Sequence, residues 1–368
     1  MNRLTGIIST NYLTEDLGAL SVERSGALVP FGGRYRLIDF VLSNMVNSAV
    51  DSIGIIAPFK YRSLIDHISS TKAWMLDKKH GGLYVLPGSA YGINRSFDRF
   101  LLRDFVDNKT YIQRIDTPYV LVTAANFVYN MNYEAMFAEH RESGADITML
   151  YTIASGDDIH PTRLTVESDR VKGFSKGVLE SDRMFMDCFI ISRDFLLAVL
   201  EWYGQADYLD LFEALYQDVD KLYIRGYQYD GFVANVFSTA NYFKYNMELL
   251  NHDVRVALFA KDAQIMTKVQ DSPPATHGKN AIVKNSLIQS GCQIDGTVEN
   301  SILSRKVKVE KGAIVKNCIL FKSVHVESGA HIENLILDKN NKIKKNVTII
   351  GSKNDIQILP KVEKELNI

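Results

Sequence analysis

Residues 30–44 read PFGGRYRLIDFVLSN, a long run that joins a glycine pair and two arginines to an apolar stretch. The segment before it, residues 9–17, reads STNYLTEDL and contains no glycine. Loops that bind phosphate are usually rich in glycine, because their backbone N–H groups must come close to the anion. A specific signature therefore stands beside a segment that is poorly suited to phosphate binding. This contrast raises the question of whether the chain has kept any catalytic chemistry.

The composition is that of an ordinary globular protein with room for two domains. The chain has 368 residues, of which 46% are hydrophobic and 23% are charged. Its 42 basic and 43 acidic side chains give a net charge of −1, so we expect neither a nucleic-acid partner nor a membrane partner. No run of eighteen apolar residues and no signal-peptide core are present, so we expect a cytoplasmic protein. Cys188, Cys292 and Cys318 lie in apolar segments without CxxC spacing, which indicates buried, reduced thiols.

Short apolar strands alternate with amphipathic helices up to about residue 253. The pattern predicts strands over residues 53–57, 119–122 and 147–151, and helices over residues 61–69 and 133–143. This alternation is typical of an α/β fold with a mainly parallel sheet and flanking helices. In such sheets, ligands bind beyond the carboxyl ends of the strands.

A different pattern follows Pro273 and Pro274. The segments NSLI, NSIL, NCIL and NLIL begin at residues 285, 300, 317 and 334, and VEKGAIV at residues 309–315 returns seventeen residues later as VESGAHI. Short strands with Gly or Asn at the corners, repeated at this period, indicate a parallel β-helix. We therefore predict an α/β domain over residues 1–255, a linker over 256–275 and a β-helix domain over 276–368. The last domain would serve regulation or subunit assembly.

The signature at residues 30–44, followed by MVNS at residues 45–48 and by a β-helix domain, resembles the glucose-1-phosphate adenylyltransferase (ADP-glucose pyrophosphorylase) family. The resemblance covers essentially the whole chain. It implies a Rossmann-like nucleotidyltransferase domain followed by a left-handed parallel β-helix. It also implies a reaction of ATP with glucose 1-phosphate that gives ADP-glucose and pyrophosphate for bacterial glycogen biosynthesis.

The phosphate-binding parts of that family are altered in this chain. Active members carry a GGxGxRL loop, which falls on residues 11–17. The glycine positions hold Asn11, Tyr12 and Thr14, and the arginine position holds Asp16. Side chains and negative charge therefore replace backbone N–H groups and positive charge. The lysine of the family's RAKPAVPFGG phrase, which contacts the phosphates, is replaced by Gly26.

The metal and sugar-phosphate positions are altered as well. The two aspartates that hold Mg²⁺ in the family correspond to Asn126 and Asn235, and a neutral amide is a poor substitute for a carboxylate at such a site. A small glycine of the sugar pocket becomes Asp187, which would crowd the pocket. Lys176 could take the place of the family's sugar-phosphate lysine, although a solvated lysine explains this position equally well.

Three arginines near the signature remain: Arg24, Arg34 and Arg36. In the family, basic residues of this region bind phosphorylated or nucleotide effectors at the junction with the β-helix, and arginine forks suit phosphate. Surface arginines that support the fold through salt bridges are the competing interpretation.

Within the family, this pattern is most similar to the regulatory, non-catalytic GlgD-type subunit. We therefore expect a chain that is inactive or nearly so by itself and binds no cofactor of its own, with Mg²⁺ used by a catalytic partner subunit in a heterotetramer. A phosphorylated sugar or a nucleotide would be its effector. Two alternatives stay open: an active but divergent nucleotidyltransferase, and a stand-alone sensor of sugar phosphate or nucleotide.

Overall fold

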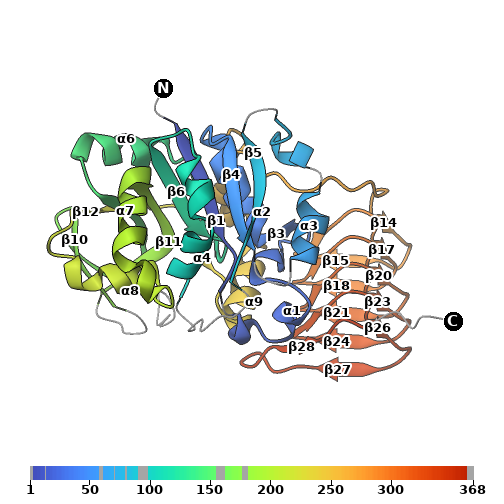
Figure 1. Ribbon diagram of the computed structural model, residues 1–368. Helices are drawn as coiled ribbons and strands as arrows, with labels where there is room; N and C mark the ends of the chain where they lie inside the picture. The colour runs from blue at the N-terminus through green and yellow to red at the C-terminus, as the bar shows by residue number, and fades with distance from the viewer. Residues whose placement is uncertain are drawn as a thin grey trace.

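The computed structural model describes residues 3–12, 14–57, 61–69, 71–78, 81–89, 98–154, 162–175 and 181–362. These residues form an α/β domain and a β-solenoid that packs against it (Figure 1). None of the helices in these ranges is long and apolar enough to cross a membrane.

A nine-stranded sheet in the order β5-β4-β1-β6-β11-β8-β12-β10-β9 is the centre of the α/β domain. Its strands are β1 (Leu4–Ser9), β4 (Ser52–Ala57), β5 (Gly82–Pro87), β6 (Tyr119–Ala124), β8 (Ile147–Ile153), β9 (Arg163–Glu167), β10 (Arg170–Ser175), β11 (Arg183–Ser192) and β12 (Ile224–Gln228). The strands from β5 to β6 are parallel to one another. β11 runs antiparallel between β6 and β8, so the expectation of a mainly parallel sheet describes the first half of the sheet, and the second half is mixed.

Helices cover both faces of the sheet. The helices in the described part of the domain are α1 (Ala19–Val22), α2 (Leu37–Asn47), α3 (Arg62–Ile68), α4 (Leu102–Asp107), α5 (Lys109–Gln113), α6 (Glu134–Ser143), α7 (Arg193–Tyr203), α8 (Leu211–Leu215), α9 (Thr239–Glu248) and α10 (His252–Leu258). Side chains of α4, α7 and α8 pack into one hydrophobic cluster, and side chains of α2, α3 and α6 pack into another on the opposite face. The predicted helix over residues 133–143 is α6, and it ends at Gly144, whose φ of 66° is a conformation that favours glycine.

The signature at residues 30–44 forms a small hairpin and then α2. β2 (Pro30–Phe31) pairs with β3 (Tyr35–Arg36), and Gly32 and Gly33 turn the chain with φ of 58° and 78°. A Cβ atom on Gly33 would lie 3.0 Å from Gln289 Cγ of the solenoid. The glycine pair is therefore required both by the turn and by the close approach of the second domain.

The solenoid is a left-handed parallel β-helix of three five-stranded sheets. One sheet contains β14 (Thr276–His277), β17 (Gln293–Ile294), β20 (Lys308–Val309), β23 (His325–Val326) and β26 (Lys342–Ile343). The second contains β15 (Ile282–Lys284), β18 (Thr297–Glu299), β21 (Ile314–Lys316), β24 (His331–Glu333) and β27 (Thr348–Ile350). The third contains β16 (Leu287–Ile288), β19 (Ile302–Leu303), β22 (Ile319–Leu320), β25 (Leu335–Leu337) and β28 (Gln357–Leu359).

The repeated asparagines of the sequence form the corners of the solenoid. Asn285, Asn300, Asn317 and Asn334 all have positive φ, between 41° and 55°. The Nδ2 atom of Asn285 donates to Oδ1 of Asn300 at 2.8 Å, and Asn317 donates to Asn334 at 3.3 Å. Asparagine tolerates this backbone conformation and also hydrogen-bonds to the next coil, which explains why it recurs at the period of the repeat.

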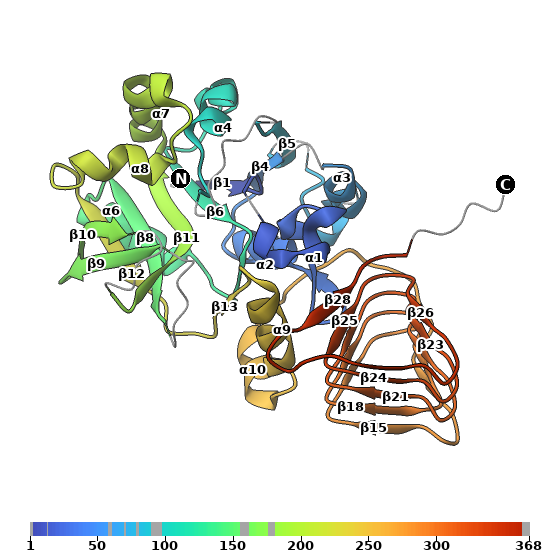
Figure 2. The same cartoon turned by 90° about the horizontal axis from the view of Figure 1, so that it is seen from below.

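The two domains share one hydrophobic cluster. Phe31, Phe40 and Tyr242 of the α/β domain pack with Ile319 and Ile336, whose strands belong to the third solenoid sheet. Figure 2 shows α9 and α10 between the nine-stranded sheet and the solenoid. α10 continues to Leu258, and the first solenoid strand begins at Thr276. This shared core fixes the solenoid against the signature hairpin.

Candidate functional site

In the part of the chain that the structure describes, several buried side chains lie at the end of the sheet where ligands are expected. β1 lies between β4 and β6, so the strand order changes direction at the carboxyl end of β1, which is where open α/β sheets bind ligands. Asn11 follows β1 and is buried, and its Nδ2 atom donates to the two carboxylate oxygens of Asp104 at 2.9 and 3.1 Å. Burial raises the pKa of Asp104 to about 6, against the hydrogen bonds from Ser89 N and Asn11. The first glycine position of the family loop thus holds a packed and hydrogen-bonded side chain.

Tyr12, Thr14 and Gly26 are packed against one another. A Cβ atom on Gly26 would lie 2.4 Å from Thr14 Cγ2 and 3.5 Å from Tyr12 Cε2. Tyr12 and Thr14 therefore occupy the space that a side chain at position 26 would need, so the residue types at positions 12, 14 and 26 are sterically coupled. Asp16 is exposed, and its carbonyl accepts a hydrogen bond from Thr239 Oγ1 of α9 at 3.2 Å.

Asn126 and Asn235 lie next to each other, although 109 residues separate them in the sequence. β7 (Phe127–Val128) pairs with β13 (Ala234–Asn235), and Val236 N donates to the carbonyl of Asn126 at 2.9 Å. Both side chains are buried. Asn126 Nδ2 donates to Oδ2 of Asp187 at 2.8 Å, and Asn235 Nδ2 lies 4.0 Å from the sulfur of Met184.

These residues do not suit a Mg²⁺ ion. Mg²⁺ takes oxygen ligands, and in proteins it is usually held by one or two carboxylates. Here Asn126 directs its NH₂ group toward Asp187, and Arg99 Nε lies 3.6 Å from the same carboxylate oxygen. Within the ranges that the structure describes, no group of three or more His, Cys, Asp or Glu side chains could hold a metal ion.

The second region of interest is a basic pocket at the contact of the two domains, which we call the junction pocket. Its cavity has a volume of about 120 Å³ and lies beside the signature hairpin. Its basic side chains come from the hairpin, the segment before the solenoid and the solenoid itself: Arg34, Arg36, Lys268, Arg305, Lys322 and Lys339. His67 also lines it, with Nε2 2.6 Å from Oδ1 of the fully buried Asp39.

Three of these cations form a column on the solenoid. Arg305, Lys322 and Lys339 are separated by 17 residues each, the period of the repeat, so they occupy equivalent positions on successive coils. In the described part of the chain, neither these three nor Arg34 forms an ion pair with a carboxylate. Arg36 donates from Nη1 to the carbonyl of Ser63 at 3.3 Å. The positive charges of this column therefore lie near those of Arg34 and Arg36.

Burial and mutual repulsion shift the pKa values of the pocket in one direction. Burial, followed by the charges of Arg36 and Arg24, lowers the pKa of Lys339 to about 8. Burial and the charges of Lys306 and Arg305 lower the pKa of Lys322, and burial and Arg34 lower the pKa of Arg305. Because the cations repel one another, an anion bound in the cavity would reduce this repulsion. The pocket is therefore chemically suited to a phosphate group.

Arg24 does not belong to the residues that line this pocket. It is buried, and its Nη2 atom donates to both carboxylate oxygens of Asp338 at 2.7 and 3.0 Å. Its guanidinium also lies 5.9 Å from the ring centre of Phe321. The structure thus brings Arg34 and Arg36 together at the pocket and places Arg24 behind it, in an ion pair that joins the two domains. Lys176 lies outside the described residues.

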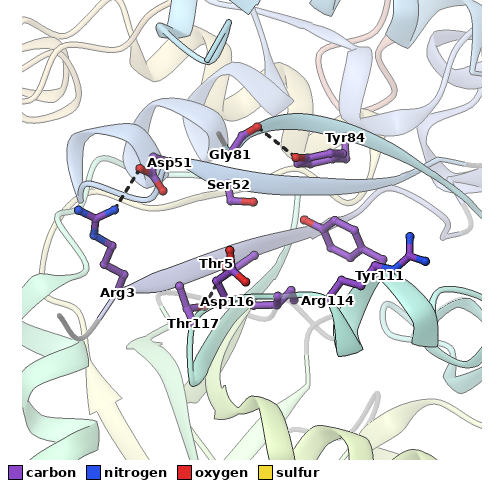
Figure 3. Close-up of a pocket in the computed structure, with 11 residues that line it drawn as sticks. Arg3, Thr5, Asp51, Ser52, Gly81, Tyr84, Tyr111, Arg114, Asp116 and Thr117 are labelled. Carbon is purple, nitrogen blue, oxygen red and sulfur yellow. Dashed lines mark hydrogen bonds and ion pairs between the residues drawn. The ribbon is translucent and has the colours of Figure 1, made fainter. Parts of the chain in front are cut away.

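A second cavity, of about 740 Å³, lies at the opposite end of the sheet (Figure 3). It is lined at the amino ends of β1, β4 and β5, where Arg3 Nη1 lies 3.8 Å from Asp51 Oδ2. Acidic Asp116 and basic Arg114 both line it, so its charges are of mixed sign. Neither its position nor its charge favours a phosphate over other ligands.

Several residues of these regions were not identified from the sequence. Arg305, Lys322 and Lys339 could have been found from the sequence, because their spacing of 17 residues equals that of the repeat. Arg99 and Asp338 carry none, since each acquires its role through a contact with a residue far away in the sequence. Asp187 was identified only as a residue that would crowd the sugar pocket.

Comparison with known proteins agrees with this architecture. Residues 15–163 match the nucleotidyl transferase family, and residues 272–357 match the GlmU-like C-terminal hexapeptide family. The glycogen biosynthesis protein GlgD of Bacillus subtilis (strain 168) is 32% identical over 84% of this chain and 82% of its own length. GlgD of Geobacillus stearothermophilus is 33% identical over 85% and 83%. Glucose-1-phosphate adenylyltransferase of Clostridium botulinum (strain Eklund 17B / Type B) is 30% identical over 81% and 80%. The chain therefore belongs to the family that comprises GlgD and glucose-1-phosphate adenylyltransferase.

Proposed function

We propose that this chain is a regulatory and catalytically silent subunit of a cytoplasmic glucose-1-phosphate adenylyltransferase that serves bacterial glycogen biosynthesis. The observation that carries the proposal is the set of packed and uncharged side chains at the carboxyl end of the sheet. Phosphoryl transfer from ATP depends on positioned positive groups and a metal ion that stabilise the phosphate charge. At this end, the amides of Asn126 and Asn235 and the packed side chains of Asn11 and Tyr12 offer neither.

The junction pocket supports a regulatory role. Arg34 and Arg36 belong to the α/β domain, whereas Arg305, Lys322 and Lys339 belong to the solenoid. A phosphorylated sugar or a nucleotide bound there would contact both domains at once, and would favour one relative arrangement of them over another. Differential binding of this kind is what allows an effector to shift a conformational equilibrium.

The partner in this proposal is a catalytic subunit that keeps the glycine-rich loop and both metal-binding aspartates. We propose that the two kinds of subunit assemble into a heterotetramer, in which Mg²⁺ is used by the catalytic subunit. The flat faces of the solenoid, and its end strands, which in the described chain pair with a neighbouring coil on one side only, are suitable surfaces for such assembly. The present chain would then change the activity of its partner through the contact and not through chemistry of its own.

The first experiment measures pyrophosphate release by the purified chain with ATP, glucose 1-phosphate and Mg²⁺. We expect no release above the background, and robust release would refute the proposal in favour of a divergent active enzyme. The second experiment adds the chain to a catalytic homologue that retains GGxGxRL and both aspartates. We expect the two to purify together and the activity or effector response of the homologue to change. Anion binding in the junction pocket without any such effect would instead indicate a stand-alone sensor.

A reversion experiment tests which loss is decisive. The variant Asn126→Asp with Asn235→Asp restores both carboxylates, but it leaves the packed loop and Gly26 unchanged. We expect negligible pyrophosphate release from this variant, because the loop still excludes the triphosphate. Substantial activity after these two changes alone would show that the loop is not the decisive alteration.

A further inference from the structure

We propose that Arg99 and Asp187 form a built-in ion pair that occupies the carboxyl end of the sheet where a metal-bound nucleotide would otherwise lie. The pair would close this end and hold three separate segments of the domain in one arrangement. The inference rests on the proposed catalytic silence of the chain, and it adds a physical device that maintains that silence.

The position of Arg99 supports this role. Ser9, the last residue of β1, donates from Oγ to the carbonyl of Arg99 at 2.6 Å, which ties this arginine to the end of the central strand. Its side chain is 3% exposed, and its Nε atom lies 3.6 Å from Oδ2 of Asp187, which is 6% exposed. The same carboxylate oxygen accepts the hydrogen bond from Asn126. A positive charge of the chain therefore lies directly beside the asparagine that corresponds to a metal-binding aspartate.

Two aromatic rings enclose the guanidinium of Arg99. Its central carbon lies 4.2 Å from the ring centre of Phe237 and 5.0 Å from that of Tyr12. Tyr12 belongs to the altered loop after β1, and Phe237 follows β13 and Asn235. A desolvated cation against aromatic faces is attracted by the ring electrons. One side chain thus links the loop after β1, the segment after β13 and strand β11.

The backbone of Asp187 indicates that its carboxylate is retained for a reason. Asp187 has a φ of 48° within β11, at the interruption of register between Phe185 and Phe189. This conformation favours glycine, and a residue with a side chain is strained in it. Strain of this kind persists where the surroundings compensate for it, and it is concentrated at functional sites. Here the compensation is the contact of the carboxylate with Arg99 and Asn126.

The pair explains why neutral residues at positions 126 and 235 are compatible with a stable domain. A bound metal ion would bring positive charge to this end of the sheet. In this chain the guanidinium of Arg99 provides a positive charge there instead. It also predicts that restoring aspartates cannot by itself restore a metal site, since the guanidinium already lies beside the carboxylate of Asp187. The ion pair of Arg99 with Asp187 and the neutral residues at positions 126 and 235 therefore depend on each other.

The test is a charge-rescue experiment on melting temperature. Arg99→Ala removes this positive charge from beside the buried carboxylate of Asp187, so we expect the melting temperature to fall by roughly 5 °C or more. Millimolar ethylguanidinium should restore part of this loss, because it can enter the space between the two rings. The matched control is Arg99→Ala with Asp187→Gly, which removes the carboxylate and the strained φ together. We expect the double variant to melt above Arg99→Ala and to gain nothing from ethylguanidinium.

Two outcomes would overturn the ion pair: an unchanged melting temperature in Arg99→Ala, or equal rescue in the single and double variants. If Arg99→Ala does not fold, Arg99→Lys is compared with Arg99→Met. An ion pair requires the lysine variant to be the more stable, whereas a side chain that only fills space requires the methionine variant to be so.

Closure of the sheet end is tested separately by photolabelling the wild-type chain with an azido-ATP probe. We expect no label in peptides that contain Asn126 or Asp187, and label there would contradict the closure. Label at the junction pocket has no bearing on it. A failure of the proposed function would appear as pyrophosphate release or as the lack of an effect on a catalytic homologue. The rescue by ethylguanidinium reports only on Arg99 and Asp187, so the two failures are distinguishable.

Discussion

The carboxyl end of the sheet contains a buried cation and the junction pocket contains a group of half-buried and exposed cations, and the two regions differ in what lies beside the positive charge. At the sheet end, Arg99 lies near the carboxylate of Asp187 and close to the rings of Tyr12 and Phe237. At the junction, Lys322 and Lys339 lie among other cations, and in the described ranges they have no carboxylate partner. A buried charge is unfavourable unless something compensates for it. We therefore propose that Asp187 compensates the charge of Arg99 at the sheet end, whereas a bound anion would compensate the cations of the junction pocket.

The largest effect is expected at the ion pair behind the junction pocket. Asp338→Ala leaves Arg24 buried without its carboxylate, so we expect the free energy of unfolding to fall by about 3–5 kcal/mol in urea titrations. The matched control is Glu299→Ala, which removes exposed ion pairs with Lys284 and Lys316 and should change little. A loss no greater than that of the control would mean that Arg24 is compensated in some other way.

The next largest effect is a dependence of the free energy of unfolding on pH, which arises from Asp104 at the sheet end. The pKa of Asp104 is about 6 in the folded chain and 3.8 ordinarily, so the folded state binds the proton more tightly. This contribution to stability is fully present below pH 3.8 and is lost as the pH rises through about 6, by up to about 3 kcal/mol. Asp104→Asn cannot titrate. We therefore expect the stability of the wild type, relative to this variant, to decrease between pH 4 and pH 7.

A relative stability of the wild type and Asp104→Asn that does not change with pH would show that the carboxylate of Asp104 is well solvated. Unfolding in urea at several pH values measures it. Other carboxylates titrate in the same range, but they do so in both proteins and cancel in the difference.

A smaller effect tests the steric closure of the loop. Gly26→Ala introduces a Cβ atom 2.4 Å from Thr14 Cγ2, so we expect the free energy of unfolding to fall by roughly 1–3 kcal/mol. Adding Thr14→Gly should remove the clash and recover part of the loss. Gly173→Ala is the control, because a Cβ atom there meets nothing within 4 Å. Equal losses from the two alanine substitutions would contradict a coupling between Gly26 and Thr14.

The smallest effect is expected in anion binding at the junction. Calorimetry with sulfate, whose charge is constant near neutrality, should show about tenfold weaker binding in Lys339→Met, which corresponds to about 1.4 kcal/mol. The pKa of Lys339 is about 8, so sulfate affinity of the wild type should fall as the pH rises through 8. Lys339→Arg should retain affinity above that pH. Lys284→Met, on an exposed face of the solenoid, should bind sulfate like the wild type.

The local features of this chain were predictable because they repeat or form a signature. The asparagine corners follow from residues 285, 300, 317 and 334, since each coil needs the same backbone conformation. The helix over residues 133–143 and the strand over 53–57 follow from hydrophobic periodicity and a terminating glycine. The mixed half of the sheet was not predicted, because nothing local to β11 specifies that it runs antiparallel between β6 and β8.

By itself, the sequence determined the family signature, the solenoid repeat and the replacement of glycines, lysine and aspartates by Asn11, Thr14, Gly26, Asn126 and Asn235. These are properties of residue type and spacing. Tertiary structure alone decided which charges are compensated. Arg24 forms an ion pair with Asp338, 314 residues away in the sequence, and does not line the junction pocket. Arg34 and Arg36 line that pocket together with the three cations of the solenoid column. The physical reason is that an ion pair depends on distance and burial, which packing creates between segments that are remote in the sequence.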